Sequence, residues 1–371
     1  MIYRPYGKTG KDVSVIGFGG MRFGEDEDYA AEVVRYANAK GINYFDTAPF
    51  YCNDRSEDIF GKAFKHMPDQ FYVSTKSMIS KEKTADEVRW RIENSLLRLG
   101  VDRINFFHMW CIMDLEQYQR IMAPGGPYEG ALKAREEGLI EHLVFSTHCR
   151  GEEIRTIIED DVFEGVLLGY NVINHPFREA GVKAAYENNI GVVTMNPLGG
   201  GLIPRYADYF KFIRDRDDET TIQAALRFNA AQKGITVVLT GMGTKEEVDE
   251  NTQVASHPLT VSLESLKKIQ SRITDKMDSL CTNCQYCREK KCPSKIKMNY
   301  YMEAYNLFLM MGSEEEMLKQ LDWYHEQGNL KEKDSLPGEC TSCRICESLC
   351  TQKLPIIDRL KEMQKIMDGR G

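Results

Sequence analysis

Eight of the eleven cysteines lie in the last quarter of the chain, in two runs of similar spacing. The runs are Cys281-x2-Cys284-x2-Cys287-x4-Cys292 and Cys340-x2-Cys343-x2-Cys346-x3-Cys350. Three thiolates at positions i, i+3 and i+6 of a tight loop can bind three irons of a cubane cluster, and a fourth thiolate from a distant segment can complete the ligand set. The spacing therefore predicts two 4Fe-4S clusters bound by these eight cysteines.

The two runs resemble the module of bacterial two-cluster ferredoxins, in which the fourth cysteine of each run ligates the other cluster. Four residues separate Cys287 from Cys292, and Thr351 stands where a proline would follow the second run. The crossed assignment of Cys292 and Cys350 therefore stays open. Two four-cysteine zinc sites are the alternative, because C-x2-C pairs also bind zinc. Four cysteines within 12 residues, and a triple spacing that occurs twice, favour clusters over zinc.

Four polar residues in the first third of the chain are suited to carbonyl reduction: Asp46, Tyr51, Lys76 and His108. A tyrosine hydroxyl, whose usual pKa is about 10, can act as a general acid when a neighbouring lysine stabilises its phenolate. A carboxylate can hold that lysine, and a histidine can orient the carbonyl oxygen. Each residue alone has an ordinary structural explanation, so the prediction depends on the fold bringing all four together.

The segments that carry these residues alternate short β-branched runs with longer amphipathic stretches. Eight strands are predicted, over residues 13–19, 42–46, 72–75, 104–108, 142–146, 166–169, 191–195 and 236–239. Helical patterns lie between them: Thr84 and Glu87 have the spacing of a capping box, and Gly100 can end that helix. Eight such units predict an α/β fold, a parallel (β/α)8 TIM barrel, with a doubly wound open sheet as the alternative. Barrel active sites lie at the C-terminal strand ends, where Asp46, Lys76 and His108 are expected.

The chain is expected to divide into two domains near Pro258. Residues 1–258 would form the barrel, with a hairpin at residues 2–12 across its bottom. Residues 259–371 would form a mainly helical, ferredoxin-like domain, with helices over residues 262–278 and 298–336 beside the cysteine runs.

The composition of the 371 residues, 42% hydrophobic and 28% charged, is that of globular domains. The net charge of -8 argues against general binding to nucleic acid or to anionic membranes, because both attract basic surfaces. No apolar run reaches 18 residues, and the first residues lack a signal-peptide pattern. We therefore expect a cytoplasmic protein. Disulfides are uncommon in that reducing compartment, which again favours metal ligation by the clustered cysteines.

A further set of short stretches lies mostly at the predicted strand ends. They are Tyr6-Gly7-Lys8-Thr9-Gly10, Gly17-Phe18-Gly19, Asn43-Tyr44-Phe45-Asp46-Thr47-Ala48 with Tyr51 and Ser56-Glu57, Ser74-Thr75-Lys76, Phe107-His108, Ser146-x-His148, Tyr170-Asn171, Asn196-Pro197-Leu198-Gly199-Gly200-Gly201 and Glu250-Asn251. Together they resemble the aldo-keto reductase family over residues 1–256. The resemblance implies a catalytic tetrad in which Tyr51 donates the proton, and a nicotinamide cofactor, NAD(P)H, across the barrel top. It also implies cofactor contacts at Ser146, Met195, Leu198, Gly199, Gly241, Glu247 and Asn251.

With the cysteine runs added, the chain resembles the iron-sulfur branch of this family, whose members carry a C-terminal ferredoxin-like domain. Glu247 stands where NADPH-preferring relatives often place an arginine against the 2'-phosphate, and a carboxylate would repel that phosphate. We therefore expect NADH to be preferred, or weak discrimination. The expected substrate is a small-molecule carbonyl compound, and the clusters would serve a ferredoxin or another redox protein. The alternative is an electron-transfer protein in which the barrel is only a platform and the clusters exchange single electrons with a redox partner.

Overall fold

A computed structural model describes residues 1–67, 70–273, 279–288, 291–331 and 333–369 of the chain. The chain separates into two compact units, one of residues 1–198 and 203–267 and one of residues 199–202 and 268–371. Each unit has its own hydrophobic core. Within the described ranges, every helix is too short or too polar to cross a membrane.

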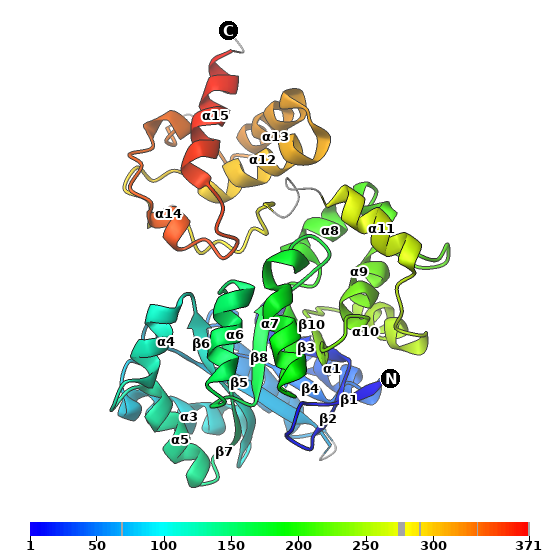
Figure 1. Cartoon of the computed structure of the whole chain (residues 1–371), viewed down its shortest axis with the longest axis vertical. Coiled ribbons are helices and arrows are strands. Elements are labelled where there is room, and N and C mark those ends of the chain that lie inside the picture. Colours follow the sequence, from blue (N-terminus) through cyan, green and yellow to red (C-terminus); the bar gives the residue numbers. More distant parts are fainter. Residues whose placement is uncertain (68–69, 274–278, 289–290, 332, 370–371) are drawn as a thin grey trace. The chain divides into compact units, whose positions relative to one another are not determined.

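The first unit contains a closed barrel of eight parallel strands, which confirms the predicted (β/α)8 barrel and excludes the open-sheet alternative (Figure 1). The strands follow one another around the barrel in chain order: β3 (Ile16–Gly19), β4 (Tyr44–Asp46), β5 (Tyr72–Met78), β6 (Ile104–Ile112), β7 (Ile140–Thr147), β8 (Gly165–Gly169), β9 (Gly191–Met195) and β10 (Val237–Thr240). The barrel closes where β10 pairs with β3, through Val238 and Ile16, Leu239 and Gly17, and Thr240 and Phe18.

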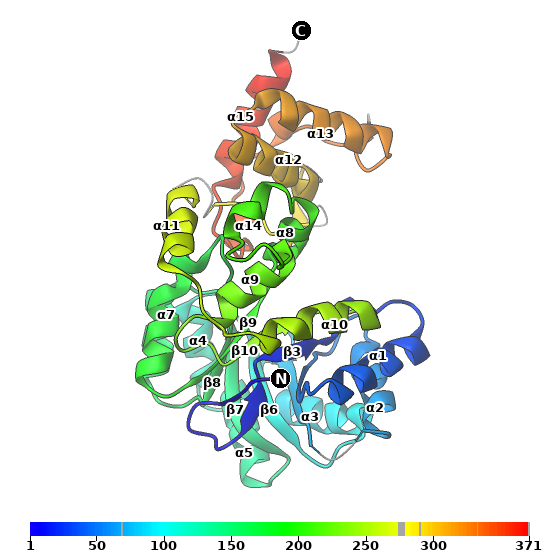
Figure 2. The same ribbon diagram turned by 90° about the vertical axis from the view of Figure 1, so that its right-hand side faces the viewer.

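Helices follow the strands, and most of them cover the outside of the barrel, whereas α8 and α11 lie beyond the strand ends (Figure 1). They are α1 (Glu27–Ala39), α2 (Ser56–Phe64), α3 (Ala85–Leu99), α4 (Leu115–Met122), α5 (Pro127–Glu136), α6 (Gly151–Glu159), α7 (His175–Glu187), α8 (Leu202–Arg205), α9 (Thr221–Ala230), α10 (Lys245–Gln253) and α11 (Leu263–Arg272). Figure 2 shows α10 and α1 close together, and the Tyr36 hydroxyl donates to the Asp249 carboxylate between them at 2.9 Å. The predicted helix over 262–278 is observed up to Arg272, and residues 274–278 lie outside the described residues.

The α3 helix begins and ends as its sequence predicts. The Thr84 side chain accepts from the backbone N–H of Glu87, and the Glu87 carboxylate accepts from the backbone N–H of Thr84 at 3.0 Å. Gly100 ends the helix with a left-handed backbone, at φ 64°. The local signals at both ends are therefore sufficient to set the limits of this helix.

The predicted strand over residues 13–19 is wrong as a single element, because the chain bends at Val15. Residues Asp12–Ser14 form β2, which pairs antiparallel with β1 (Tyr3–Pro5), and only Ile16–Gly19 enters the barrel. The Ser14 hydroxyl donates to the carbonyl of Ile16 at 2.7 Å, and the Ser14 N–H donates to Asn43 Oδ1 at 2.7 Å. These bonds fix the bend between the two strands.

Tyr6, just after β1, fills the barrel interior with its fully buried ring. The ring centroid lies 4.3 Å from that of Phe106. Gly165 and Gly191, which begin β8 and β9, leave the space that the ring occupies. A Cβ atom on Gly191 would lie 2.2 Å from the Tyr6 ring, and one on Gly165 would lie 2.3 Å from its hydroxyl oxygen.

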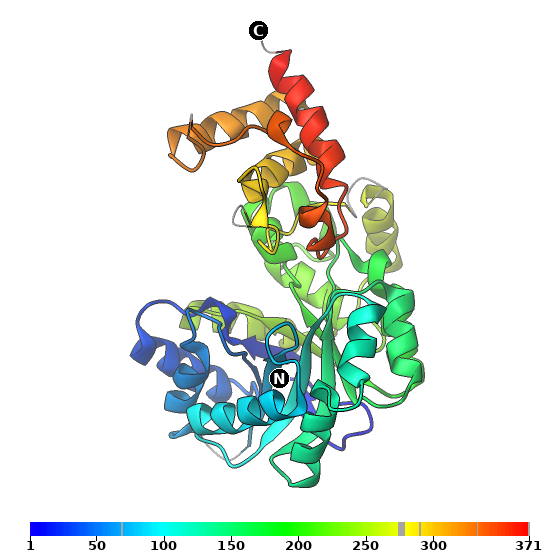
Figure 3. The same cartoon turned by 90° about the vertical axis from the view of Figure 1, so that its left-hand side faces the viewer.

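The second unit is helical and packs around the cysteine segments. Its helices are α12 (Met298–Met311), α13 (Glu314–Glu326), α14 (Ile345–Ser348) and α15 (Ile356–Asp368). Figure 3 shows α15, in red, beside α12, and their apolar side chains share one core with several of the cysteines. The helical prediction for 298–336 is wrong beyond Glu326, because Gly328 has a left-handed backbone at φ 68° that ends the helical path.

Gly191→Ala is expected to destabilise the barrel, since the new Cβ would overlap the Tyr6 ring and overpacking of a core costs about 1–3 kcal/mol. Denaturant unfolding measures the loss. Gly24→Ala is the matched control, because a Cβ at Gly24 would have no other atom within 4 Å. If the two variants proved equally stable, Tyr6 would not be wedged against β9.

Candidate functional site

Three of the four predicted catalytic residues lie buried on neighbouring barrel strands. Asp46 ends β4, Lys76 is on β5 and His108 is on β6, and Lys76 and His108 are register partners. The expectation that all three close their strands is wrong for Lys76 and His108, because β5 continues to Met78 and β6 to Ile112. The three side chains nevertheless meet, because Asp46 lies opposite Ser74 of β5, and Lys76, two residues further on the same face, lies opposite His108.

A buried ion pair joins Lys76 to Asp46. Lys76 Nζ lies 2.5 Å from Asp46 Oδ1 and donates to the carbonyl oxygen of Thr47 at 2.6 Å. The two side chains are only 1% and 3% exposed. Burial lowers the pKa of Lys76, and the Asp46 carboxylate opposes that shift. Such a pair is held only when hydrogen bonds satisfy its remaining groups.

Ser74 links Asp46 to His108. Its Oγ lies 2.7 Å from Asp46 Oδ2 and 2.9 Å from His108 Nε2, whereas the direct distance from His108 Nε2 to Asp46 Oδ2 is 3.9 Å. Because the carboxylate can only accept, Ser74 donates to Asp46 and accepts from His108 Nε2–H. Burial, followed by the Lys76 charge, holds the pKa of His108 well below its usual value, so the imidazole is neutral.

The sequence-based prediction of the site does not include Ser74, although the position of this serine relative to Lys76 points to it. It stands two positions before Lys76, so the two side chains share one face of β5. A serine on the face that carries a predicted catalytic lysine is a candidate to form hydrogen bonds with the residues that pair with that lysine. Because serine is common in strands, this role can be assigned only when the strand register is known.

Tyr51 is presented beside Lys76 by the loop after β4. Lys76 Nζ lies 5.4 Å from the centre of the Tyr51 ring. The Tyr51 and Trp110 rings pack edge to face, with their centroids 5.5 Å apart. Phe50, Cys52, Asn53 and Asp54 all have left-handed backbone angles, from φ 52° to 70°. Such a run is costly, and the surrounding bonds must hold it.

Arg98 secures that loop from the neighbouring helix α3. Its guanidinium lies 2.8 Å from an Asp54 carboxylate oxygen and 3.3 Å from the buried carboxylate of Glu57. Asp54 also makes a hydrogen bond within the loop, because its Oδ1 accepts from the backbone N–H of Phe50 at 3.0 Å. The loop is therefore fixed on both sides of Tyr51.

The predicted cofactor residues lie at or after the C-terminal ends of other strands. Ser146 is buried near the end of β7, Met195 ends β9, and Leu198 and Gly199 follow it. Gly199 has a left-handed backbone at φ 63° and groups with the second unit, together with residues 200–202.

The remaining predicted cofactor residues lie on or before α10. Gly241 follows β10 and is exposed, whereas Asn251 is buried and donates from Nδ2 to Thr240 Oγ1 at 3.4 Å. The Glu247 carboxylate accepts from the backbone N–H of Gly243 at 2.6 Å, so it closes the loop before the helix. Lys245, the nearby positive charge, forms an ion pair with Glu32.

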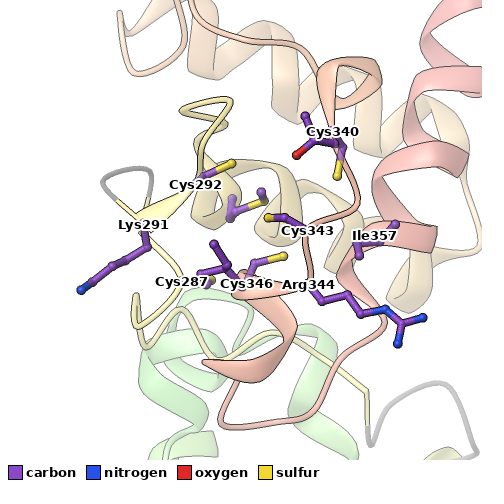
Figure 4. Close-up of a pocket in the computed structure, with 11 residues that line it drawn as sticks. Cys287, Lys291, Cys292, Cys340, Cys343, Arg344, Cys346 and Ile357 are labelled. Carbon is purple, nitrogen blue, oxygen red and sulfur yellow. The ribbon is translucent and has the colours of Figure 1, made fainter. Parts of the chain in front are cut away.

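The eight clustered cysteines line two cavities of the second unit. The first cysteine cavity is lined by Cys281, Cys284, Cys287 and Cys350. The second cysteine cavity is lined by Cys287 and by Cys292, Cys340, Cys343 and Cys346. Figure 4 shows the sulfur atoms of these last four residues around one common space. The fourth cysteine of each run thus faces the first three of the other run.

Burial raises the pKa values of four of these cysteines, Cys281, Cys287, Cys346 and Cys350. The pKa of Cys287 is raised to about 12 and that of Cys346 to about 11, in both cases mainly by burial. Cys281 is further fixed by Asn306 of α12, whose amide accepts from the Cys281 N–H and donates to its carbonyl, each at 2.8 Å. In the described parts of the chain, no group of three or more His, Cys, Asp or Glu side chains is placed to hold a metal ion.

Comparisons with known proteins concern mainly the barrel. The sequence model of the aldo/keto reductase family matches residues 15–271. The chain is similar to L-galactose dehydrogenase of Arabidopsis thaliana, at 27% identity over 303 residues, which cover 73% of this chain and 92% of the plant protein. It is similar to pyridoxine 4-dehydrogenase of Escherichia coli K12, at 25% identity over 286 residues, 70% of this chain and 94% of that protein. The holo form of an aldo-keto reductase from Bacillus halodurans has the same barrel fold, with a TM-score of 0.63 and 23% identity over 73% of this chain and 96% of that one.

Ser74→Ala is expected to lower the free energy of unfolding by about 1–3 kcal/mol, because it leaves one Asp46 oxygen and His108 Nε2 buried without their partner. Ser77→Ala is the matched control on the same strand. Ser77 is fully buried, but its hydroxyl has no hydrogen-bond partner among the described residues, so its loss should cost little. Equal unfolding free energies for the two variants in urea would contradict the linking role of Ser74.

Proposed function

Because the chain belongs to the aldo/keto reductase family, we propose that its barrel reduces a carbonyl group of a small molecule with a nicotinamide cofactor. The observation that carries the proposal is the buried pair of Lys76 and Asp46 beside the ring of Tyr51. A lysine that is held charged next to a tyrosine lowers the cost of forming a phenolate. That arrangement suits a tyrosine that gives up a proton during the reaction.

Each residue then has one task in the reaction. The Tyr51 hydroxyl donates the proton to the carbonyl oxygen, and neutral His108 orients that oxygen when its Nε2–H turns from Ser74 to the substrate. The Lys76 ammonium stabilises the phenolate that remains on Tyr51, and Asp46 keeps Lys76 protonated despite its burial. A bound nicotinamide supplies the hydride that the carbonyl carbon receives.

The residues proposed to hold the cofactor fit NADH better than NADPH. The Ser146 hydroxyl and the Asn251 amide are polar groups near the C-terminal ends of β7 and β10, where a cofactor in a barrel would lie. At the start of α10, a 2'-phosphate would meet the carboxylates of Glu246 and Glu247, and Lys245 is already paired with Glu32. We therefore propose a preference for NADH, or weak discrimination.

We further propose that the two cysteine cavities each hold a 4Fe-4S cluster. In support, three thiols of one run and the fourth of the other line each cavity, with Cys287 shared by both, and this three-plus-one division is the one that such clusters use. The crossed assignment follows: Cys350 completes the set of Cys281, Cys284 and Cys287, and Cys292 completes the set of Cys340, Cys343 and Cys346. Because thiolates are the ligands, the raised thiol pKa values imply that cluster assembly releases protons.

The clusters are proposed to carry single electrons for a redox partner protein. A hydride carries two electrons at once, whereas a cluster accepts one, so a direct exchange with the nicotinamide would need a group that splits the pair. We therefore assign carbonyl reduction to the barrel residues and one-electron transfer to the second unit, as two separate reactions.

Tyr51→Phe is expected to lower kcat for NADH-driven reduction of 4-nitrobenzaldehyde by roughly two orders of magnitude or more, because the variant has no proton to donate. NADH binding, followed by fluorescence titration, should stay unchanged. Tyr118→Phe is the matched control, since its hydroxyl bonds Asp160 on the outside of the barrel. Near-normal turnover of Tyr51→Phe would reject the assignment of Tyr51 as the proton donor.

Anaerobically purified protein is expected to contain about eight irons and eight sulfides per chain, two cubane clusters. Cys350→Ser should lose the cluster of the first cavity and Cys292→Ser that of the second, so each variant keeps about half of the iron. Cys149→Ala removes a thiol outside both cavities and should keep all of it. Stoichiometric zinc, with little iron or sulfide, would overturn the cluster proposal.

A further inference from the structure

A buried arginine of α15 adjoins the first cysteine cavity. Arg359 is 5% exposed, and Ile356, three positions earlier on the same face of the helix, lines that cavity. The Nη2 of Arg359 donates to the carbonyl oxygen of Ser279 at 2.8 Å, two residues before Cys281. Arg359 therefore lies between α15 and the segment that leads into the first cysteine run.

The buried guanidinium of Arg359 is only partly hydrogen-bonded. A guanidinium has five N–H donors, and Nη1 of Arg359 has no hydrogen-bond partner within the described ranges. Burial lowers the pKa of Arg359, and the groups that oppose this shift are Tyr305, the thiols of Cys281 and Cys350, and Glu362. Burying a cation is costly unless an anion is close, and the carbonyl that Arg359 bonds stands only two residues before the first ligand-type cysteine of this cavity, Cys281.

The other charged groups near this cavity are engaged differently. Glu362 is exposed, and its carboxylate accepts from the Tyr305 hydroxyl. Glu303 of α12 is 4% exposed, and its carboxylate accepts from Asn283 Nδ2 at 3.2 Å. Tyr305 packs its ring against the guanidinium, with Arg359 Cζ 4.9 Å from the ring centroid.

The second cysteine cavity differs in its charges. The basic residues among those that line it are Lys291 and Arg344, and both are exposed (Figure 4). Exposed charges are screened by water and salt, so they act weakly on a buried group. The two cavities thus differ in whether a positive charge lies beside them in a place that water reaches poorly.

We propose that Arg359 raises the reduction potential of the cluster in the first cysteine cavity. The inference rests on the proposed function, because it requires a cluster there. A cubane cluster with four thiolate ligands carries a net negative charge, and reduction adds one more electron. A buried cation with a free N–H near the cavity stabilises the reduced form more than the oxidised form. Arg359 thus acts on the cluster electrostatically, through its positive charge, and not as a ligand.

The test is a redox titration of the full chain, followed by the electron paramagnetic resonance signals of the reduced clusters. Arg359→Gln should lower one of the two midpoint potentials by at least a tenfold change in the reduction equilibrium, about 59 mV for a one-electron couple. The other midpoint should stay unchanged. Arg359→Lys keeps the charge and should restore most of the midpoint potential. Arg344→Gln, an exposed control, should change the reduction equilibrium of either cluster by less than about threefold.

Each outcome separates the inference from the proposed function. Unchanged midpoints in an Arg359→Gln protein with full iron content would overturn the role of Arg359 and leave the clusters in place. Wild-type protein without iron and sulfide would instead overturn the cluster proposal itself. If Arg359→Gln failed to fold, Arg359→Lys would decide, because a fall in the midpoint potential of about 59 mV with the charge retained would exclude charge as the cause.

Discussion

The charge of Lys76 must be neutralised at a place in the barrel that water does not reach, and the candidate active site is built around that requirement. Asp46 provides the negative charge and the carbonyl of Thr47 takes a second N–H. Because a buried carboxylate also needs its other oxygen satisfied, Ser74 is drawn in, and Ser74 in turn fixes the proton of His108. Removing any one member would leave another member buried without a partner.

The sequence is sufficient to predict the barrel and to nominate four residues for its site, but not the contacts that connect them. Eight β-branched runs and the polar residues near their ends identify the units, and the capping signals of Thr84 and Gly100 are local. The contact between Ser74 and His108 depends on the register of β5 against β6, which is set by tertiary packing. The bend at Val15 likewise depends on a side chain 29 positions from Ser14, that of Asn43.

The cysteine spacing identifies which residues gather, yet their grouping is a property of the folded unit. Both runs could supply four ligands to one site each, and their spacing alone does not decide between that and a crossed arrangement. Packing of α12 and α15 brings Cys350 to the cavity of the first run and leaves Cys292 facing the second. Polar anchors complete this arrangement, because Asn306 holds the backbone of Cys281 through both its N–H and its carbonyl.

Closure of the barrel by β3 and β10 has a consequence for the protein during its synthesis. The Thr240 hydroxyl donates to the carbonyl of Gly17 at 3.5 Å, across 223 positions of the chain. At roughly 5–20 residues per second, a ribosome needs about 11 to 45 seconds to deliver the second strand after the first. Until then one edge of β3 has no neighbour, and an open strand edge is a template for aggregation. The interval in which that edge of a nascent chain is exposed is thus set by the rate of translation, rather than by the residues of β3 themselves.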